Sequence, residues 1–467
     1  MYSNEEIKQA DAKYFQKLSD NKTELKEALS KKHSPNISEN IFMSLNEFFE
    51  FATDGDAMGW LANLYDAEIG GFYFSNSARD TDGFLPDLES TKQALGFLFS
   101  SRAATQIAPT LSKLLPPWMK DDVINFVKKM QDPENGYFYH PQWDRAESDA
   151  HPSRLGRDLE WAVNILTELE SHPTYNTPNG HPGDGIRFDG VTVQSKTAKQ
   201  YIAPDAPARP HLEDRKSFAA FLTEFEAKLS TNSWEIGNRF EAEAPQIAER
   251  DRQLEAAGKE SGLADMLADW FTAHQNPENG AWTSRSEVSY DSTNGLLKIS
   301  STYNKLGKRF PNPALGLKTA ITCITDESVP DTVCHVLNPW YAVNVISANA
   351  KRYSKSDSEL REVSALREYI SCNCPEMIRA TTRKLSRFKI GDGSFIYKPN
   401  RKGISQGMRV APDNVLDGDI NATTIAARAI IEHIYDIIEV EMPPLYSGGD
   451  VMKFLNIIEN KKKSLTK

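Results

Sequence analysis

The chain has 467 residues, 39% of them hydrophobic and 25% charged, which is the composition of a folded protein with a large core. Its net charge of −11 argues against a surface that binds nucleic acid or anionic membranes. No apolar run approaches the ~18 residues of a membrane helix, and the polar, acidic N-terminus is not a secretory signal. We therefore expect a cytoplasmic protein, or a periplasmic or secreted one whose signal peptide has been removed.

One short phrase recurs along the chain. It reads EIGGFYFSNS from Glu68, QDPENGYFYH over 131–140, QNPENGAWTS over 275–284 and KIGDGSFIYKPN from Lys389. Each copy joins a turn-forming glycine to aromatic residues. Each is followed by a pattern typical of an amphipathic helix, with a capping residue near its start. These predicted helices span 87–101, 153–170, 292–307 and 418–438.

Two further segments belong to the same series. EWAVNILT at 160–167 matches WYAVNVIS at 340–347, so a helix is also predicted there, and 232–243 is interpreted as a degenerate unit. Six or seven helical hairpins would fill the chain. Because one hairpin cannot bury its apolar face alone, neighbouring hairpins must stack. We expect a single domain over 1–467.

Residues 172–213 interrupt the pattern because they are rich in proline and glycine. Within them, IRFDGVTV alternates around Asp-Gly and predicts a short β-hairpin. Long insertions are often functional loops, so this one is interpreted as a lid, with a packing arm on the outer surface as the alternative. Residues 460–467 are expected to form a flexible tail.

The recurring phrases also resemble known motifs. QDPENGYF and QNPENGAW resemble the Gln…Gly-x-Trp motifs of terpene cyclases and prenyltransferases, with one residue inserted, and DGSFIYKPN is similar to the Asp-Gly-Ser-Phe turn of α/α-toroid polysaccharide lyases. The resemblance implies an all-α (α/α)6 or (α/α)7 toroid. In that fold an inner ring of helices lines a cavity and an outer ring covers it, with the glycine-aromatic turns at one rim.

Polar residues on the predicted inner helices are candidates for substrate binding. On 292–307, Asn294 and Lys298 lie one turn apart, on a different side from the leucines. Aromatic faces stack on sugars, and cations with amides bind acidic groups, so the expected partner is an acidic polysaccharide or oligosaccharide. The substrate-binding candidates are Glu89, Gln93, Trp143, Arg157, Trp161, Asn164, Asn294, Lys298, Asn338 and Asn344.

This lining predicts a polysaccharide lyase that cleaves a uronic-acid-containing glycan, such as alginate or glucuronan, by β-elimination. The reaction needs donors that neutralise the sugar carboxylate, a base and an acid, but no metal and no cofactor. In α/α-toroid lyases, asparagine and arginine commonly do the first task, and tyrosine, often with histidine, does the others. The catalytic candidates are Tyr341 or Tyr303, assisted by His335 or His140, although Tyr303 falls on the apolar side of its helix.

Three alternatives remain open. A glycoside hydrolase would need paired carboxylates, and the candidates are Asp80, Asp82, Asp87, Glu89, Asp417 and Asp419. A terpenoid cyclase would need an Asp-x-Asp-Asp motif, but DGDI at 417–420 lacks the second adjacent aspartate. A non-enzymatic helical scaffold would keep the repeats without needing a polar inner face.

The four cysteines lie within one region, at 323, 334, 372 and 374. Metal ligation by Cys372 and Cys374 is one interpretation, although a zinc site would usually show a second pair of ligands. Inert thiols are the other. The sequence does not set the oligomeric state.

Overall fold

The computed structural model describes residues 1–185, 209–284, 288–399, 403–405 and 407–465. Over these residues the chain is predominantly helical, so the all-α prediction is confirmed. The strands in this part of the chain are a short antiparallel pair, β1 (Ile404–Ser405) and β2 (Met408–Arg409). The hairpin predicted in IRFDGVTV (186–193) lies outside the described residues.

The helices before residue 186 are α1 (Asn4–Lys32), α2 (Pro35–Thr53), α3 (Ala57–Asn63), α4 (Asn76–Arg79), α5 (Leu88–Ser100), η1 (Ala104–Gln106), α6 (Leu111–Leu114), α7 (Pro117–Lys129), α8 (Arg145–Ala150) and α9 (Pro152–Glu168). Those that follow are η2 (Pro210–Leu212), α10 (Arg215–Thr223), α11 (Glu226–Leu229), α12 (Ser233–Ala256), α13 (Leu263–Ala273), α14 (Tyr290–Lys305), α15 (Pro313–Thr325), α16 (Val333–Tyr353), α17 (Asp357–Leu385), α18 (Ile420–Thr424), the π-helical turn η3 (Ile425–Ala429), α19 (Ile430–Ile437) and α20 (Gly448–Ser464).

Two of the four copies of the recurring phrase, at 131–140 and 275–284, fold into the same turn. Gln131 donates from Nε2 to the carbonyl oxygen of Gly136, at 3.2 Å, and Gln275 donates in the same way to Gly280, at 2.8 Å. Both glycines have a left-handed backbone, with φ of +69° and +68°. The glutamine side chains also bond the next loop, Gln131 at Tyr175 and Gln275 at Pro311 and Asn312. The phrase is therefore repeated because the same corner is built twice.

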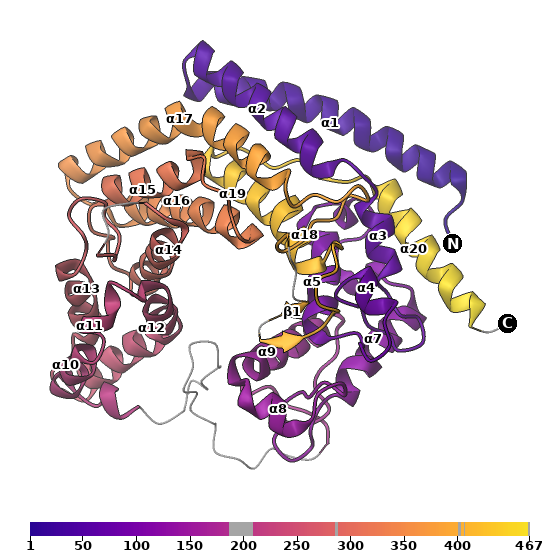
Figure 1. Cartoon of the computed structure of the whole chain (residues 1–467), viewed down its shortest axis with the longest axis horizontal. Coiled ribbons are helices and arrows are strands. Elements are labelled where there is room, and N and C mark those ends of the chain that lie inside the picture. Colours follow the sequence, from indigo (N-terminus) through magenta and orange to yellow (C-terminus); the bar gives the residue numbers. More distant parts are fainter. Residues whose placement is uncertain (186–208, 285–287, 400–402, 406, 466–467) are drawn as a thin grey trace.

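The helices that follow these corners pack side by side in one series. The contacts run from α12 to α14, from α14 to α16, from α16 to α19, from α18 to α5 and from α5 to α9. Figure 1 shows these helices following one another around the molecule, with α12 and α14 on one side and α5 and α9 on the other. The two segments matched by sequence, 160–167 and 340–347, lie in α9 and α16 and so belong to this series, which we call the inner series.

A second set of helices covers the inner series. Helix α13 packs on α12, α15 on α14 and α16, α17 on α15, α16 and α2, and α7 on α9. The first and last helices close the chain, since α1 packs on α20 and Tyr2 and Asn456 exchange two 2.8 Å hydrogen bonds. Apolar side chains between the two sets form the core. No helix in the described part of the chain is long and apolar enough to cross a bilayer.

Two segments differ from expectation. Residues 460–464 were expected in a flexible tail, but they continue α20, because Lys461 and Lys462 donate to the carbonyl oxygens of Ala62 and Ala67 among others. The described beginning of the predicted lid packs against the corner at Gly136, where Tyr175 bonds Gln131. Residues 172–185 thus pack beside this corner, and residues 186–208 lie outside the described residues.

Candidate functional site

Polar side chains join each neighbouring pair of helices in the inner series. Hydrogen bonds or ion pairs link α12 to α14, α14 to α16, α16 to α19, α18 to α5 and α5 to α9. Seven of the ten substrate-binding candidates predicted from sequence take part in them. We call this set the polar belt, and its members are Glu89, Gln93, Arg157, Glu241, Asn294, Lys298, Asn338, Asn344, Asn421 and His433.

The centre of the belt is a tyrosine–histidine pair between α16 and α19. The ring of Tyr341 stacks on the ring of His433, with centroids 4.6 Å apart and planes 22° apart. Tyr341 is 38% exposed, so solvent reaches part of its side chain. Asn344, one turn further along α16, donates from Nδ2 to Nδ1 of His433 at 3.0 Å. Tyrosine, histidine and asparagine are thus brought together at one place.

A neighbouring carboxylate determines which nitrogen of His433 carries the proton. Nδ2 of Asn344 also donates to Oδ2 of Asp436, at 3.3 Å, and this orients the amide with its nitrogen towards the imidazole. In a neutral ring Nδ1 then accepts, and Nε2 keeps the hydrogen. Burial lowers the pKa of His433 to about 4, with Asp436 opposing the shift, so the ring is neutral at pH 7.

Tyr341 is held in its protonated form. Burial raises its pKa above the ordinary value, and the charge of Glu241 on α12 raises it further. Glu241 is itself paired with two lysines of α14, at 2.9 Å from Nζ of Lys298 and 3.4 Å from Nζ of Lys305. A protonated tyrosine, a carboxylate and two ammonium groups therefore lie within electrostatic reach of one another.

Two amides continue the belt between α14 and α16. Nδ2 of Asn338 donates to Oδ1 of Asn294 at 2.7 Å. Asn338 lies one turn before Tyr341 on α16, and Asn294 lies one turn before Lys298 on α14. Both side chains are half-buried, so their remaining donors and acceptors face a partly accessible surface.

The belt ends in a charged cluster between α5 and α9. Glu89, which is 1% exposed, accepts from Arg157 at 2.7 Å and from Gln93 at 3.2 Å, and Gln93 also donates to Asn421 on α18 at 3.1 Å. Behind it, the buried Arg154 pairs with Asp87 and Asp158, each at 2.9 Å. Burial raises the pKa of Asp158 in this cluster.

Several buried polar atoms in this cluster have no hydrogen-bond partner among the described residues. They are Oε1 of Gln93, Nε of Arg157 and Nε1 of Trp161. The guanidinium of Arg157 lies 5.5 Å from the centre of the Trp161 ring, and Asn164 follows one turn later, half-buried. Buried polar atoms without a partner are uncommon in folded proteins, and their grouping here marks this end of the belt as a candidate site.

Four predicted residues lie elsewhere. Tyr303 is 1% exposed and its hydroxyl donates to the carbonyl oxygen of Ala268 at 2.7 Å, so this candidate acid/base residue is in the core. His140 and Trp143 are buried beside the turn at 131–140, with their ring centroids 4.4 Å apart and their planes tilted by 39°. His335 stacks on Tyr290 at the start of α16, two turns from Tyr341.

His140 has both ring nitrogens occupied. Nε2 is 2.5 Å from the carbonyl oxygen of Pro86, and Nδ1 accepts from the backbone of Gln142 at 3.1 Å. A structural role explains it fully, so neither Tyr303 nor His140 is kept as a catalytic candidate. The aspartates considered for a hydrolase are similarly engaged, since Asp87 and Asp419 cap α5 and α18.

Sequence reasoning missed His433 and Glu241. His433 is the only histidine in the helix predicted over 418–438, and a polar residue within the apolar run AIIEHIYDII was an available signal. Glu241 lies in the degenerate unit at 232–243, where no motif distinguished it from its acidic neighbours. In both cases the partner across the helix pair, and not the local sequence, reveals the site.

The cysteines do not form a cluster. Cys372 is exposed and Cys374 is buried on α17, and burial raises the pKa of the Cys374 thiol to about 12. Residues two apart on a helix do not share a face, so the two thiols cannot converge. The described residues contain no group of three or more side chains that could hold a metal ion.

Comparison with protein-family models, with curated proteins and with solved structures gave no match.

Proposed function

We propose that the protein is a polysaccharide lyase that acts on a uronic-acid-containing glycan, with its centre at Tyr341 and His433. The observation that carries the proposal is the exposed Tyr341 ring stacked on a neutral His433 that Asn344 orients. The resemblance of the corner motifs to α/α-toroid lyases supports the same class. The series α12, α14, α16, α18–α19, α5 and α9 favours an (α/α)6 toroid over the seven-hairpin form.

In the proposed reaction, Lys298, Asn294 and Asn338 neutralise the sugar carboxylate, which makes the adjacent proton acidic. Lys298 leaves Glu241 to do so, and the carboxylate of Glu241 takes that proton. The electron pair forms the carbon–carbon double bond as the glycosidic carbon–oxygen bond breaks. The hydroxyl of Tyr341 gives its proton to the leaving oxygen. Glu241 then returns a proton to Tyr341 through solvent.

The electrostatics of the site suit this order of events. The charge of Glu241 raises the pKa of Tyr341 and keeps it protonated before reaction. Once Glu241 has accepted a proton that charge is gone, so Tyr341 becomes a stronger acid when the leaving oxygen needs one. His433 orients the tyrosine ring by stacking.

To test this, the protein is incubated with acidic polysaccharides of the alginate, glucuronan, pectate, heparan and chondroitin types. The ultraviolet absorbance and the concentration of reducing ends are measured in the same reactions. A lyase raises both, and Tyr341→Phe should lower the rate about 100-fold or more. Tyr369→Phe is the matched control, because Tyr369 on α17 is 39% exposed and lies outside the polar belt.

Three outcomes would count against the proposal. New reducing ends without absorbance would mean hydrolysis, which would direct attention to carboxylates of the inner series. Equal loss of activity in both tyrosine variants would remove Tyr341 from the chemistry. If neither absorbance nor reducing ends increase with any of the glycans, a non-enzymatic binding protein would be favoured.

A further inference from the structure

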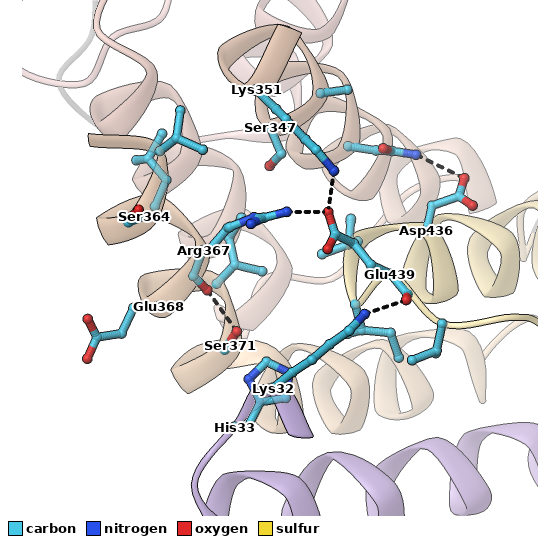
Figure 2. A pocket seen from close by; sticks show the side chains of 18 of the residues that line it. Lys32, His33, Ser347, Lys351, Ser364, Arg367, Glu368, Ser371, Asp436 and Glu439 are labelled. Carbon is cyan, nitrogen blue, oxygen red and sulfur yellow. Dashed lines mark hydrogen bonds and ion pairs between the residues drawn. The ribbon is translucent and has the colours of Figure 1, made fainter. Parts of the chain in front are cut away.

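A pocket of about 1230 Å³ lies where the C-terminal ends of α16 and α19 meet α17 and the corner between α1 and α2 (Figure 2). Sites for small ligands usually enclose roughly 300–1,000 Å³, so this volume admits one or more sugar units. Asn344 and Asp436 line it, but Tyr341 and His433 do not. The rise of an α-helix places Lys351 in the pocket about 15 Å along α16 from Tyr341.

Three cations from three helices converge on one residue in this pocket. Nζ of Lys351 and Nη2 of Arg367 lie 2.8 and 2.6 Å from the same carboxylate oxygen of Glu439, and Lys32 donates to the backbone carbonyl oxygen of Glu439 at 2.6 Å. Figure 2 shows the three side chains pointing toward Glu439 from different directions. Ammonium and guanidinium groups placed in this way form a binding site for a carboxylate.

The side chain of Glu439 can leave its contacts with Lys351 and Arg367. It follows the end of α19 and is half-exposed, so its side chain can turn outward without breaking the helix. Its backbone is left-handed, with φ of +55°, a conformation that disfavours residues other than glycine. An incoming carboxylate would meet the same two charged donors.

The rest of the lining suits the body of a sugar. The hydroxyls of Ser347, Ser364 and Ser371 each donate to a carbonyl oxygen of their own helix, which leaves their lone pairs as acceptors for sugar hydroxyls. Apolar side chains complete the wall and can cover the carbon–hydrogen face of a ring. They are Ile37, Val363, Leu366, Ile370, Ile438 and Val440.

We propose that this pocket binds the carboxylate of a uronic acid, which replaces the side chain of Glu439 on Lys351 and Arg367. The identity of the sugar rests on the proposed lyase function, while the carboxylate chemistry rests on the pocket alone. Asn344 connects the two sites, because it lines the pocket and also bonds His433. The pocket is thus a second glycan subsite, separate from the reacting bond.

The test is to titrate glucuronate, glucose and phosphate into the wild-type protein and single variants by calorimetry. Glucuronate should bind and glucose should not. Arg367→Met should weaken glucuronate about 10-fold or more, since a hydrogen bond between charged groups is lost. Glu439→Gln should tighten it several-fold, because the competing carboxylate is gone. Arg379→Met is the control, an exposed arginine of α17 that pairs with Glu376 outside the pocket.

Unchanged affinity in both Arg367→Met and Glu439→Gln would overturn the proposal. Phosphate that binds as tightly as glucuronate would also overturn it, because the site would then be a general anion site. The titrations are repeated in Tyr341→Phe, in which turnover is expected to be about 100-fold slower or more. If glucuronate binds with these mutational effects but the protein has no lyase activity, the elimination proposal is refuted and the pocket proposal holds. If the protein is an active lyase but the variants do not change glucuronate affinity, only the pocket proposal is refuted.

Discussion

Arg154 illustrates how tightly single residues are constrained near the polar belt. Its side chain is 3% exposed, and it pairs with Asp87, Glu89 and Asp158 at 2.9, 3.4 and 2.9 Å. Removing one partner of a buried ion pair leaves uncompensated charge, which typically costs about 3–5 kcal/mol. We therefore expect Arg154→Met to lower the free energy of unfolding by about that amount, measured by urea denaturation.

Arg157→Met is the control for this prediction. Its side chain is 20% exposed and its ion pair is with Glu89, so water can reach the site after substitution. The loss should be clearly smaller than for Arg154→Met. Equal losses in the two variants would mean that burial does not set the cost.

His140 predicts a pH dependence of stability. Burial lowers its pKa to about 4 in the folded chain, against an ordinary value of 6.5. Between these values the unfolded chain binds the proton and the folded chain does not, so stability is lost as pH falls from about 6.5 to 4. A shift of about 2.5 units corresponds to roughly 3 kcal/mol. His433, shifted in the same direction, adds to this loss.

Urea denaturation of wild type and His140→Gln at pH 7.5, 6 and 5 checks this prediction. Glutamine can still donate to Pro86 and accept from Gln142, but it does not titrate in this range. The variant should lose less stability on acidification, and the difference between the two proteins isolates His140 from other groups. Parallel curves would show that His140 is not the acid-sensitive group.

Residue types and the apolar side of a helix could be predicted at this scale, but the partners across a helix pair could not. Asn294, Asn338 and Asn344 were expected to take part in the site, and the structure places all three in the polar belt. Tyr303 shares α14 with Asn294, and it lies in the core, as its place on the apolar side of the predicted helix indicates. The side chains that a helix exposes depend on which neighbouring helices cover it. His433 could be recognised as part of the site only from the packing of α19 on α16.

Among the elements, the glycine corners make the sharpest prediction. A Cβ on Gly136 would lie 2.2 Å from the carbonyl oxygen of Asn176, and φ there is +69°. The left-handed backbone costs an alanine about 1 kcal/mol, and forced overpacking adds about 1–3 kcal/mol. We expect Gly136→Ala to lower the free energy of unfolding by about 3 kcal/mol.

Gly258 provides a matched control for the backbone cost. Its φ of +65° is nearly the same, but a Cβ there meets nothing within 4 Å. Gly258→Ala should therefore cost about 1 kcal/mol, again measured by urea denaturation. If the two variants are equally destabilised, the contact with Asn176 does not constrain the corner.

The corners were the elements most readily predicted from sequence, because their geometry is set locally by glycine and by the asparagine or aspartate before it. Elements that depend on distant contacts were missed. The pair β1–β2 has no alternating pattern of useful length, and the extension of α20 through 460–464 depends on Lys461 reaching carbonyl oxygens near residue 62. A lysine-rich C-terminal segment is predicted to be exposed to solvent as long as the carbonyl oxygens that its lysines contact are unknown.

At the scale of the whole molecule, we expect the inner series to close into a ring, as in an α/α toroid. Side-by-side contacts run from α12 round to α9, and the first and last helices are joined through Tyr2 and Asn456. The packing of α1 on α20 joins the two ends of the chain, and Figure 1 shows the series curving around the molecule, with α12 on one side and α9 on the other.

Small-angle X-ray scattering distinguishes these shapes in solution. A compact single domain of this length has a radius of gyration of about 23 Å by the usual scaling with chain length. A closed toroid should give a value close to this and a pair-distance distribution with a single maximum. An open solenoid of the same hairpins would give a clearly larger radius and a long tail in the distribution. That result would contradict the toroid and, with it, the enclosed polar surface on which the lyase proposal depends.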